Sequence, residues 1–287
     1  MSLRWLITGA AGMVGHDVVQ ALQMRNEDVV AFNRGELDIA DAAAVRTRVE
    51  QVRPDIVVNC AAYTRVDDAE REESLASAIN GSAVDCLAEA ANACGALLTQ
   101  ISTDFVFDGS KRKPYDIDDA PAPLSAYGRS KLLGEHAATG ARDFLIVRTA
   151  WLFGTHGPNF VEAIRNQVRK GTNPLRVVDD QRGRPTYTPH LARAIVELSM
   201  LARRSAEARG IVHYADEDEC TWFDFAREIV SLTGGAVQIK PVSTSEFSRP
   251  APRPAYSVLS TERYERLTGA KPDSWREGLR EYFALRP

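Results

Sequence analysis

The sequence predicts an α/β fold built on a doubly wound parallel sheet, followed by a smaller C-terminal region. Short apolar runs bounded by turn residues alternate with helical patterns through the first half of the chain, and this alternation is typical of parallel strands joined by crossover helices. A glycine-rich segment links the first apolar run directly to the first helical pattern. After about Trp151, glycine and proline segments separate shorter elements, which indicates that the regular sheet ends there.

The first half contains five predicted strands and two clear helices. The strands are bounded by turn residues and rich in β-branched side chains, and they are expected at Arg4–Thr8, Asp28–Phe32, Asp55–Asn59, Leu97–Ser102 and Phe144–Thr149. Helices are expected at Met13–Met24 and at Ser74–Cys94, where Gly95 supplies a typical helix C-terminus. We therefore predict a nucleotide-binding type of domain over residues 1–153.

The remaining residues, 154–287, are expected to form mostly a substrate-binding region, with some segments packing back on the first domain. Segments such as "THGPN", "KGTNP" and "SRPAPRPAYS" supply its turns. Helices are expected at His190–Leu201, Thr221–Thr233 and Ser274–Leu285. No internal repeat is visible.

Composition excludes several classes of function. The chain has 287 residues, 44% of them hydrophobic, and a formal charge of −4, so it offers no basic footprint for nucleic acid. Its four cysteines show no C-x-x-C spacing and its five histidines no paired-ligand pattern, which favours a reduced protein without a metal site. No apolar run approaches the ~20 residues of a membrane span, and we expect a cytoplasmic protein.

The segment "LITGAAGMVG" places Gly9, Gly12 and Gly15 between the first strand and the first helix. Glycine allows a tight turn, lets backbone N–H groups approach a diphosphate and lets the helix lie close to the sheet, while the helix N-terminus adds partial positive charge. A glycine pattern alone is common. In this position it indicates a Rossmann-type dinucleotide site.

The residues after the second strand bear on the choice of dinucleotide. An acidic residue usually ends this strand when a ribose 2′-hydroxyl is bound, but the chain reads Phe32-Asn33-Arg34. Arg34 suits a 2′-phosphate, so NADPH is favoured and NADH remains an alternative, as does a solvated arginine. Asp38 offers a carboxylate to the adenine amino group, or caps the helix that begins near Asp41.

Three residues fit the chemistry of ketone reduction. Thr103 follows a predicted parallel strand at the edge where ligands bind, and Tyr127 and Lys131 share one face of the next helix. A phenol with a pKa near ~10 is a slow proton donor at neutral pH, and a nearby ammonium favours its phenolate. Thr103 would hold the same substrate oxygen. Tyrosine and lysine also occur four apart on ordinary helices, where the lysine stem covers the ring.

The motifs "TGAAGMVG", "NCAAYTRVDDAE", "STDFVFDG", "YGRSK" and "VRTAWLFG" resemble the extended short-chain dehydrogenase/reductase family, and the similarity continues through "VVDDQRGRPTYTPHLA" and "RPAPRPAYSVLST". The resemblance implies that Tyr127 donates a proton and that Lys131 binds the nicotinamide ribose and tunes Tyr127. It also implies that Thr103, Asp104 and Trp151 contact the sugar of a nucleotide sugar, although Trp151 is alternatively a core aromatic. The cofactor lining that it implies is Gly12, Met13, Val14, Asp38, Ile39, Ala61, Ala62 and Tyr63.

The expected reaction is NADPH-dependent reduction of the C4 ketone of a dTDP-4-keto-6-deoxy sugar. Phe105 stands where the family usually has tyrosine, and related dehydratases carry a second carboxylate there, so an apolar residue favours reduction over dehydration. A 4-epimerase shares the tyrosine and lysine and stays an alternative, as does a non-catalytic NADP-binding regulatory subunit. Arg182, Arg184 and Arg253 are candidates for the diphosphate. A homodimer is left open.

Overall fold

The computed structural model describes residues 2–234 and 237–286. A six-stranded sheet in the order β10-β5-β4-β3-β1-β2 forms its centre, and every neighbouring pair in this sheet is parallel. The strands are β1 (Arg4–Thr8), β2 (Asp28–Phe32), β3 (Ile56–Asn59), β4 (Leu97–Thr103), β5 (Phe144–Thr149) and β10 (Gly210–His213). The prediction of a doubly wound parallel sheet is thus confirmed, and five of the strands lie where the sequence placed them, within one residue.

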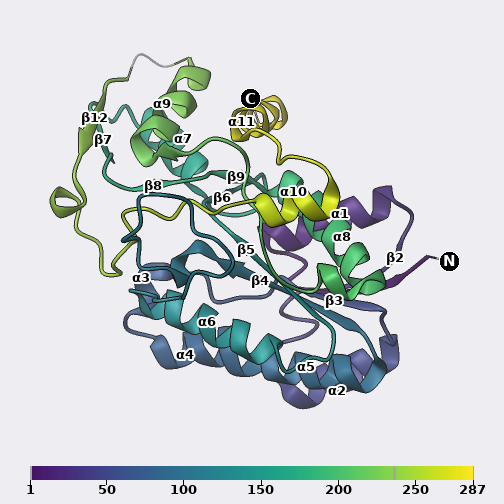
Figure 1. Ribbon diagram of the computed structural model, residues 1–287. Coiled ribbons are helices and arrows are strands. Elements are labelled where there is room, and N and C mark those ends of the chain that lie inside the picture. The colour runs from purple at the N-terminus through teal and green to yellow at the C-terminus, as the bar shows by residue number, and fades with distance from the viewer. Residues whose placement is uncertain (1, 235–236, 287) are drawn as a thin grey trace.

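Helices cover both faces of this sheet (Figure 1). Those of the first half are α1 (Met13–Met24), α2 (Ala42–Val52), α3 (Val66–Ala69), α4 (Glu73–Ser77), α5 (Ala83–Cys94) and α6 (Ala126–Ala138). Those of the second half are α7 (Phe160–Arg169), α8 (Thr188–Arg204), α9 (Trp222–Thr233), α10 (Glu262–Thr268) and α11 (Trp275–Leu285). Short strands outside the main sheet are β6 (Leu152–Phe153), β7 (Leu175–Val178), β8 (Arg182–Gly183), β9 (Thr186–Tyr187), β11 (Cys220–Thr221) and β12 (Ile239–Val242).

The side chains of β1 alternate between two layers of the core, one on each face of the sheet. Trp5 and Ile7 pack with Leu22 of α1 and Leu191 of α8, whereas Leu6 packs on the other face in the layer that α2 and α5 cover. Successive side chains of a strand point to opposite faces, and all residues of this strand from Trp5 onward are buried. The near-continuous apolar run "WLI" therefore reflects a strand covered on both faces.

One predicted helix differs in detail. The span Ser74–Cys94 is not a uniform α-helix, because the π-helical segment η1 (Ala78–Ser82) separates α4 from α5. Within it, the Asn80 side chain accepts from the backbone N–H of Tyr63 at 2.8 Å and donates to the hydroxyl of Ser130 on α6 at 2.9 Å. The π-helical turn therefore connects the α4–α5 segment to α6 through the side chain of Asn80.

Three elements of the second half, β10, α8 and α10, pack on the main sheet and its helices. The strand β10, which the sequence analysis did not predict, pairs with β5, and α8 packs against α1. The helix α10 also packs here, since Tyr264 joins the core shared by α1 and α8. Outside this layer, α7, α9, β7 and β12 lie together in a lobe above the sheet (Figure 1). This lobe has its own core around Phe153, Phe225 and Trp275. No helix among the described residues is both long and apolar enough to span a membrane.

Candidate active site

The glycine loop after β1 brings backbone segments too close for any side chain. A Cβ on Gly9 would lie 2.6 Å from the backbone nitrogen of Ala61, and one on Gly15 would lie 2.3 Å from the carbonyl oxygen of Gly9. Gly9 also has φ +65°, a conformation that favours glycine. At the start of α1, Gly12 provides no side-chain cap, and the first turn holds no acidic residue. The uncapped N–H groups and the tight loop fit a dinucleotide diphosphate.

The end of β2 contains a carboxylate that the sequence analysis missed. Glu36 folds back so that its Oε2 accepts the backbone N–H of Asn33 at 2.9 Å, although no acid follows Phe32 directly. Arg34 is 81% exposed and lies 3.7 Å from a carboxylate oxygen of Asp38, so its guanidinium is accessible to a 2′-phosphate. The cap of α2 is Asp41, which accepts from Ala43 and Ala44. The alternative role of Asp38 as that cap is therefore wrong.

The other residues expected to line the cofactor cluster near the carboxyl edges of β1 and β3. Met13 and Val14 begin α1, Ala61 and Ala62 follow Cys60 after β3, and Ile39 is buried in the layer under α2. Tyr63 is also buried, but its hydroxyl donates to Glu72 at 2.8 Å. The backbone N–H of Tyr63 donates to the side chain of Asn80 at 2.8 Å.

Tyr127 lies in the first turn of α6, which Ser125 caps through a hydrogen bond from Gly128. Thr103 ends β4 and Asp104 begins the short helix η2 (Asp104–Val106). Burial and, to a lesser extent, the charge of nearby Asp104 raise the pKa of Tyr127 to about 12, against a hydrogen bond with Thr103 that lowers it. The structure therefore brings the phenol, the threonine hydroxyl and the aspartate together at the end of β4, with the phenol protonated at neutral pH.

Asp104 is itself unusual because it is 1% exposed and one carboxylate oxygen, Oδ2, has no hydrogen-bond partner in the protein. The other oxygen, Oδ1, accepts the hydroxyl of Thr103 at 3.0 Å. Burial raises its pKa to about 6, and the neighbouring hydroxyl groups of Ser257 and Thr103 lower it. An unsatisfied buried carboxylate oxygen is a costly feature, and a hydroxyl of a bound ligand would satisfy it.

Lys131 lies one helical turn after Tyr127 and is 4% exposed. Its Nζ donates to the carbonyl oxygen of Ile101 at 2.7 Å. Burial lowers the pKa of Lys131 to about 8, while Glu135 and Cys60 raise it. The sequence analysis expected this ammonium to lower the pKa of Tyr127, but Lys131 is not among the groups that shift that phenol. Hydrogen bonding to β4 holds the ammonium in place instead.

A cavity of about 640 Å³ opens next to Phe105, although Thr103, Tyr127 and Lys131 are not among the residues that line it. Phe105 and Trp151 line it near the end of the sheet, and the ring of Phe105 meets that of Tyr127 edge to face with centroids 5.7 Å apart. Arg253 also lines it, but both of its terminal nitrogens donate to Asp67, at 3.0 and 3.1 Å. Further lining residues that the sequence analysis missed include Phe160, Trp222, Phe247, Gln181, Arg176 and Arg249.

Two of these missed residues are cations of the kind expected for a diphosphate. Arg249 is 52% exposed and lies 3.5 Å from Asp67, and Arg176 is 51% exposed and lies 3.6 Å from Glu246. Their ion pairs are longer than the bidentate pair of Arg253, so their guanidinium groups exchange partners at lower cost. Arg249 and Arg253 lie in the same "RPAPRP" segment. The presence of Arg249 beside Arg253 could therefore have indicated from sequence a second candidate for the diphosphate.

Arg182 and Arg184 do not line this cavity. Arg182 lies in β8 and pairs with Glu219 at 3.2 Å, with both side chains well exposed. The prediction that these arginines bind the diphosphate is therefore not supported by their placement. Alternate residues of a strand point to opposite sides, and the loop sequence alone did not reveal which side faces the cavity.

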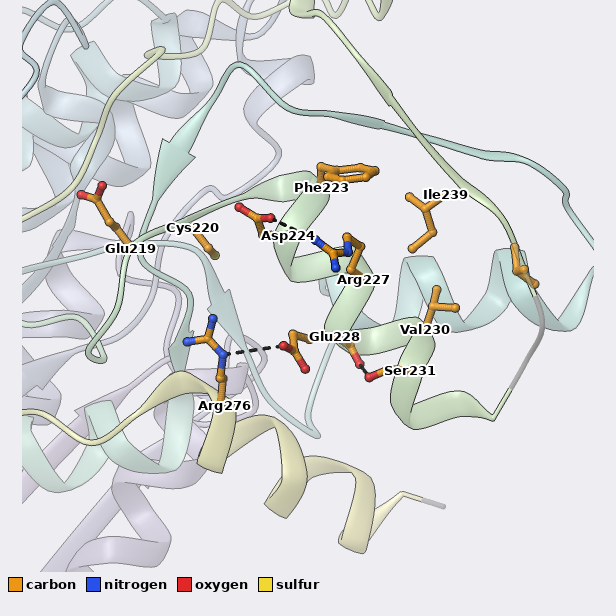
Figure 2. A pocket seen from close by; sticks show the side chains of 11 residues that line it. Glu219, Cys220, Phe223, Asp224, Arg227, Glu228, Val230, Ser231, Ile239 and Arg276 are labelled. Carbon is orange, nitrogen blue, oxygen red and sulfur yellow. Dashed lines mark hydrogen bonds and ion pairs between the residues drawn. The ribbon is translucent and has the colours of Figure 1, made fainter.

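A second hollow, of about 660 Å³, lies beside α9 and contains none of the predicted site residues. Figure 2 shows ion pairs among its charged side chains, with Arg276 reaching toward Glu228 and Arg227 toward Asp224. These pairs are exposed and their N···O distances are 3.7 and 3.9 Å. Charges that already compensate each other give the hollow no evident ligand.

One histidine cluster was not visible in the sequence. Ligand atoms of His16, Asp17 and His156 lie within 4.8 Å of one another, but His156 is distant in sequence, so spacing gave no indication of it. The two imidazole rings stack with centroids 3.5 Å apart and planes at 25°. Stacked rings direct their in-plane lone pairs side by side, which is a poor arrangement for sharing one metal ion.

Comparisons with known proteins place this geometry in a family. The family model described as "RmlD substrate binding domain" matches residues 3–286. The chain belongs to this family. The match includes both the dinucleotide loop and the upper lobe, so the family covers the sheet and the cavity together.

Individual relatives agree with this assignment. The chain is 44% identical over 289 residues to a dTDP-4-dehydrorhamnose reductase from Streptomyces griseus, with 98% of this chain and 93% of that protein covered. It is 41% identical to a dTDP-4-keto-6-deoxy-D-glucose reductase from Streptomyces niveus, over 99% of this chain and 98% of the relative. A crystal structure of dTDP-4-dehydrorhamnose reductase from Bacillus anthracis in complex with NADP superposes with a TM-score of 0.93 at 38% identity, covering 99% of this chain and 100% of that one.

Proposed function

We propose that this protein reduces the C4 ketone of a dTDP-4-keto-6-deoxy sugar with NADPH, and that dTDP-4-dehydro-L-rhamnose, which yields dTDP-L-rhamnose, is its substrate. The relatives named above are reductases of such sugars, and the structure from Bacillus anthracis holds NADP. The observation that carries the proposal is the group at the end of β4, where Tyr127 meets Thr103 and Asp104 beside a cavity large enough for a nucleotide sugar.

NADPH, when bound, supplies the hydride. Its diphosphate would lie against the uncapped N-terminus of α1, and Arg34 would bind its 2′-phosphate. The loop fits a dinucleotide diphosphate because Gly9 lies so close to Ala61 that any side chain at Gly9 would collide with the backbone there. NADH is the alternative cofactor, and Glu36 is the residue that would favour it.

Tyr127 would donate the proton that the developing alkoxide requires. Its raised pKa keeps the phenol protonated before the reaction, which is the form that a proton donor needs. Thr103, through the hydrogen bond that it already shares with Tyr127, would hold the substrate oxygen in reach. Lys131, whose ammonium is held in place by the carbonyl oxygen of Ile101, would bind the nicotinamide ribose.

The cavity divides naturally between sugar and nucleotide. Phe105 and Trp151 would contact the sugar near Tyr127, and the orphan oxygen of Asp104 would accept one of its hydroxyl groups. Arg249 and Arg176 are the preferred partners for the diphosphate, with Arg253 anchoring the wall through Asp67.

The test is NADPH consumption by the purified protein across a panel of dTDP- and UDP-linked 4-keto sugars, with product stereochemistry determined by NMR. Stoichiometric oxidation of NADPH with a reduced C4 supports the proposal. Interconversion of C4 epimers without net NADPH oxidation would establish the epimerase alternative, and tight NADPH binding without turnover on any keto sugar would establish the regulatory one. Sedimentation of the same sample tests the homodimer, which stays a prediction.

A further inference from the structure

Trp151 has an unusual backbone conformation. Its φ is +47°, in the left-handed region that large non-glycine residues rarely adopt. It directly follows Ala150 at the end of β5, and it lines the cavity. A strained conformation of this kind persists only where the surrounding structure determines it, and such conformations cluster at ligand sites. Neighbouring residues must therefore hold Trp151 in place.

One face of the Trp151 indole is covered by Trp222. The two rings are nearly parallel, with centroids 3.5 Å apart and planes at 6°. Phe160 of α7 contacts Trp222 in turn, with centroids 4.6 Å apart. Trp222 is therefore held against Trp151 by the helix behind it, and an aromatic stack extends from the end of the sheet into the upper lobe.

The other side of the indole is covered by Gly183. A Cβ at Gly183 would lie 2.4 Å from Cε2, 2.6 Å from Nε1 and 2.7 Å from Cζ2 of Trp151. These distances are far shorter than a van der Waals contact, so only glycine leaves space for the ring. Gly183 lies in the segment "DDQRGRPT", for which the sequence analysis offered phosphate binding by its arginines.

The two walls around the indole are parts of one structure. Gly183 of β8 pairs with Cys220 of β11, and Trp222 follows β11 directly. The backbone of Arg182 is further fixed by hydrogen bonds with Ala255 and Ser257 at 2.9 and 2.8 Å. A shift of Gly183 relative to Trp222 would break this pairing, so the slot has a fixed width.

We infer that Gly183 and Trp222 are positioning residues, which clamp the Trp151 indole so that it meets the sugar with its edge and not with a face. This inference rests on the proposed function. With both faces covered, Trp151 contacts a ligand in the cavity only through its ring edge, and its strained backbone sets that edge at the end of β5. The glycine segment thus shapes the sugar site through Gly183.

The test compares Gly183→Ala with Arg182→Ala, its exposed neighbour in the same strand. Gly183→Ala displaces the indole, so we expect the KM for the keto nucleotide sugar to rise about 10- to 100-fold, while NADPH binds with unchanged affinity. Arg182→Ala should leave KM unchanged. Circular dichroism supplies a readout that needs no substrate, because two stacked indoles give an exciton couplet that Gly183→Ala should weaken and Trp222→Leu should remove.

Several outcomes would overturn the inference. A wild-type KM in Gly183→Ala would do so, as would a raised KM in Arg182→Ala, which would restore the phosphate role. If Gly183→Ala does not fold, Trp222→Leu decides, since it removes one wall without adding an atom to the slot; a normal KM in that variant also rejects the clamp. Absence of turnover in the wild-type protein would count against the proposed function alone, and the couplet would still test the stack.

Discussion

Lys131 Nζ donates a 2.7 Å hydrogen bond to the carbonyl oxygen of Ile101, a residue of the strand that ends at Thr103. The ammonium is thus fixed by β4, while the phenol of Tyr127 is held by Thr103 on that same strand. A single strand therefore sets the positions of both groups. The two groups have different roles, because the phenol of Tyr127 is the proposed proton donor and stays protonated until the substrate takes its proton.

Replacing Tyr127 with phenylalanine removes the proposed proton donor and leaves the ring. Turnover should fall about 10²- to 10⁴-fold, the usual contribution of a positioned acid, while NADPH affinity stays almost unchanged. Steady-state kinetics and fluorescence titration with NADPH measure the two quantities. Tyr115→Phe is the matched control. The hydroxyl of Tyr115 donates to Asp108 at a distance of 2.7 Å and takes no part in the proposed site. Wild-type turnover in Tyr127→Phe would remove Tyr127 from the mechanism.

The charge of Lys131 should give the enzyme an alkaline limit. Burial lowers its pKa from the ordinary 10.5 to about 8, and the cation is the protonated form, so the charge is present below about pH 8 and lost above it. The nicotinamide ribose then lacks its charged hydrogen-bond donor, and kcat/KM should fall about tenfold per pH unit above this midpoint. Lys131→Arg should abolish the fall, because a guanidinium stays charged. A profile that is flat to about pH 10 in the wild type contradicts the assignment.

Behind the site, Glu135 of α6 and Arg148 of β5 form a buried ion pair at 2.7 Å, with side chains 3% and 1% exposed. Ser102 donates to the same carboxylate at 2.5 Å. Glu135→Gln leaves the arginine charge buried without its counter-charge, so the free energy of unfolding should drop by about 3 to 5 kcal/mol. Urea unfolding measures it. Glu73→Gln, which breaks the exposed pair of Glu73 with Arg129, should cost less than about 1 kcal/mol; equal losses in the two variants would refute the argument.

Cofactor preference should depend on two residues after β2. Arg34→Ala removes the exposed guanidinium, and we expect NADPH to bind about tenfold more weakly while NADH changes little. Glu36→Gln removes a negative charge next to Asn33 and should strengthen NADPH binding. Isothermal titration with both dinucleotides measures the two effects. If Arg34→Ala weakened NADH as much as NADPH, Arg34 would not be the contact to the 2′-phosphate.

The sequence predicted the sheet well because its strands are short apolar runs with both faces buried, and because the crossover helices carry clear end signals such as Gly95. It missed β10, whose four residues lie outside the regular alternation and join the sheet only through pairing with β5. The π-helical turn at Ala78–Ser82 was equally hidden. It depends on the side-chain contacts of Asn80 with Tyr63 and Ser130, which no local periodicity encodes.

The candidate site was predictable where it lies on regular elements. Tyr127, Lys131 and Thr103 follow from one helix and one strand end, and the structure brings them together. The nucleotide end of the cavity was not predictable, since it is built from loops of the upper lobe. Arg249 lines the cavity, whereas Arg182 does not and is well exposed. The direction of a loop side chain is set by tertiary packing, and that information is absent from local sequence.

Phe105 should govern how strongly the sugar is held. Its ring lines the cavity and meets Tyr127 edge to face, so it presents an apolar surface where a hydroxyl-bearing ring would offer a hydrogen bond. Phe105→Tyr adds that hydroxyl at the sugar end of the cavity. One added hydrogen bond to a neutral partner contributes about 0.5 to 1.5 kcal/mol, so KM should fall roughly 2- to 10-fold.

The gain should appear with a 4-keto-6-deoxy sugar and vanish with an analogue that lacks the sugar hydroxyl bound by the new phenol. Phe247→Tyr makes the same change elsewhere in the cavity wall and should affect the parent sugar and its deoxy analogues equally. Assays with the 2-deoxy and 3-deoxy analogues separate the cases, and an equal change for every analogue in Phe105→Tyr would show that Phe105 does not contact the sugar.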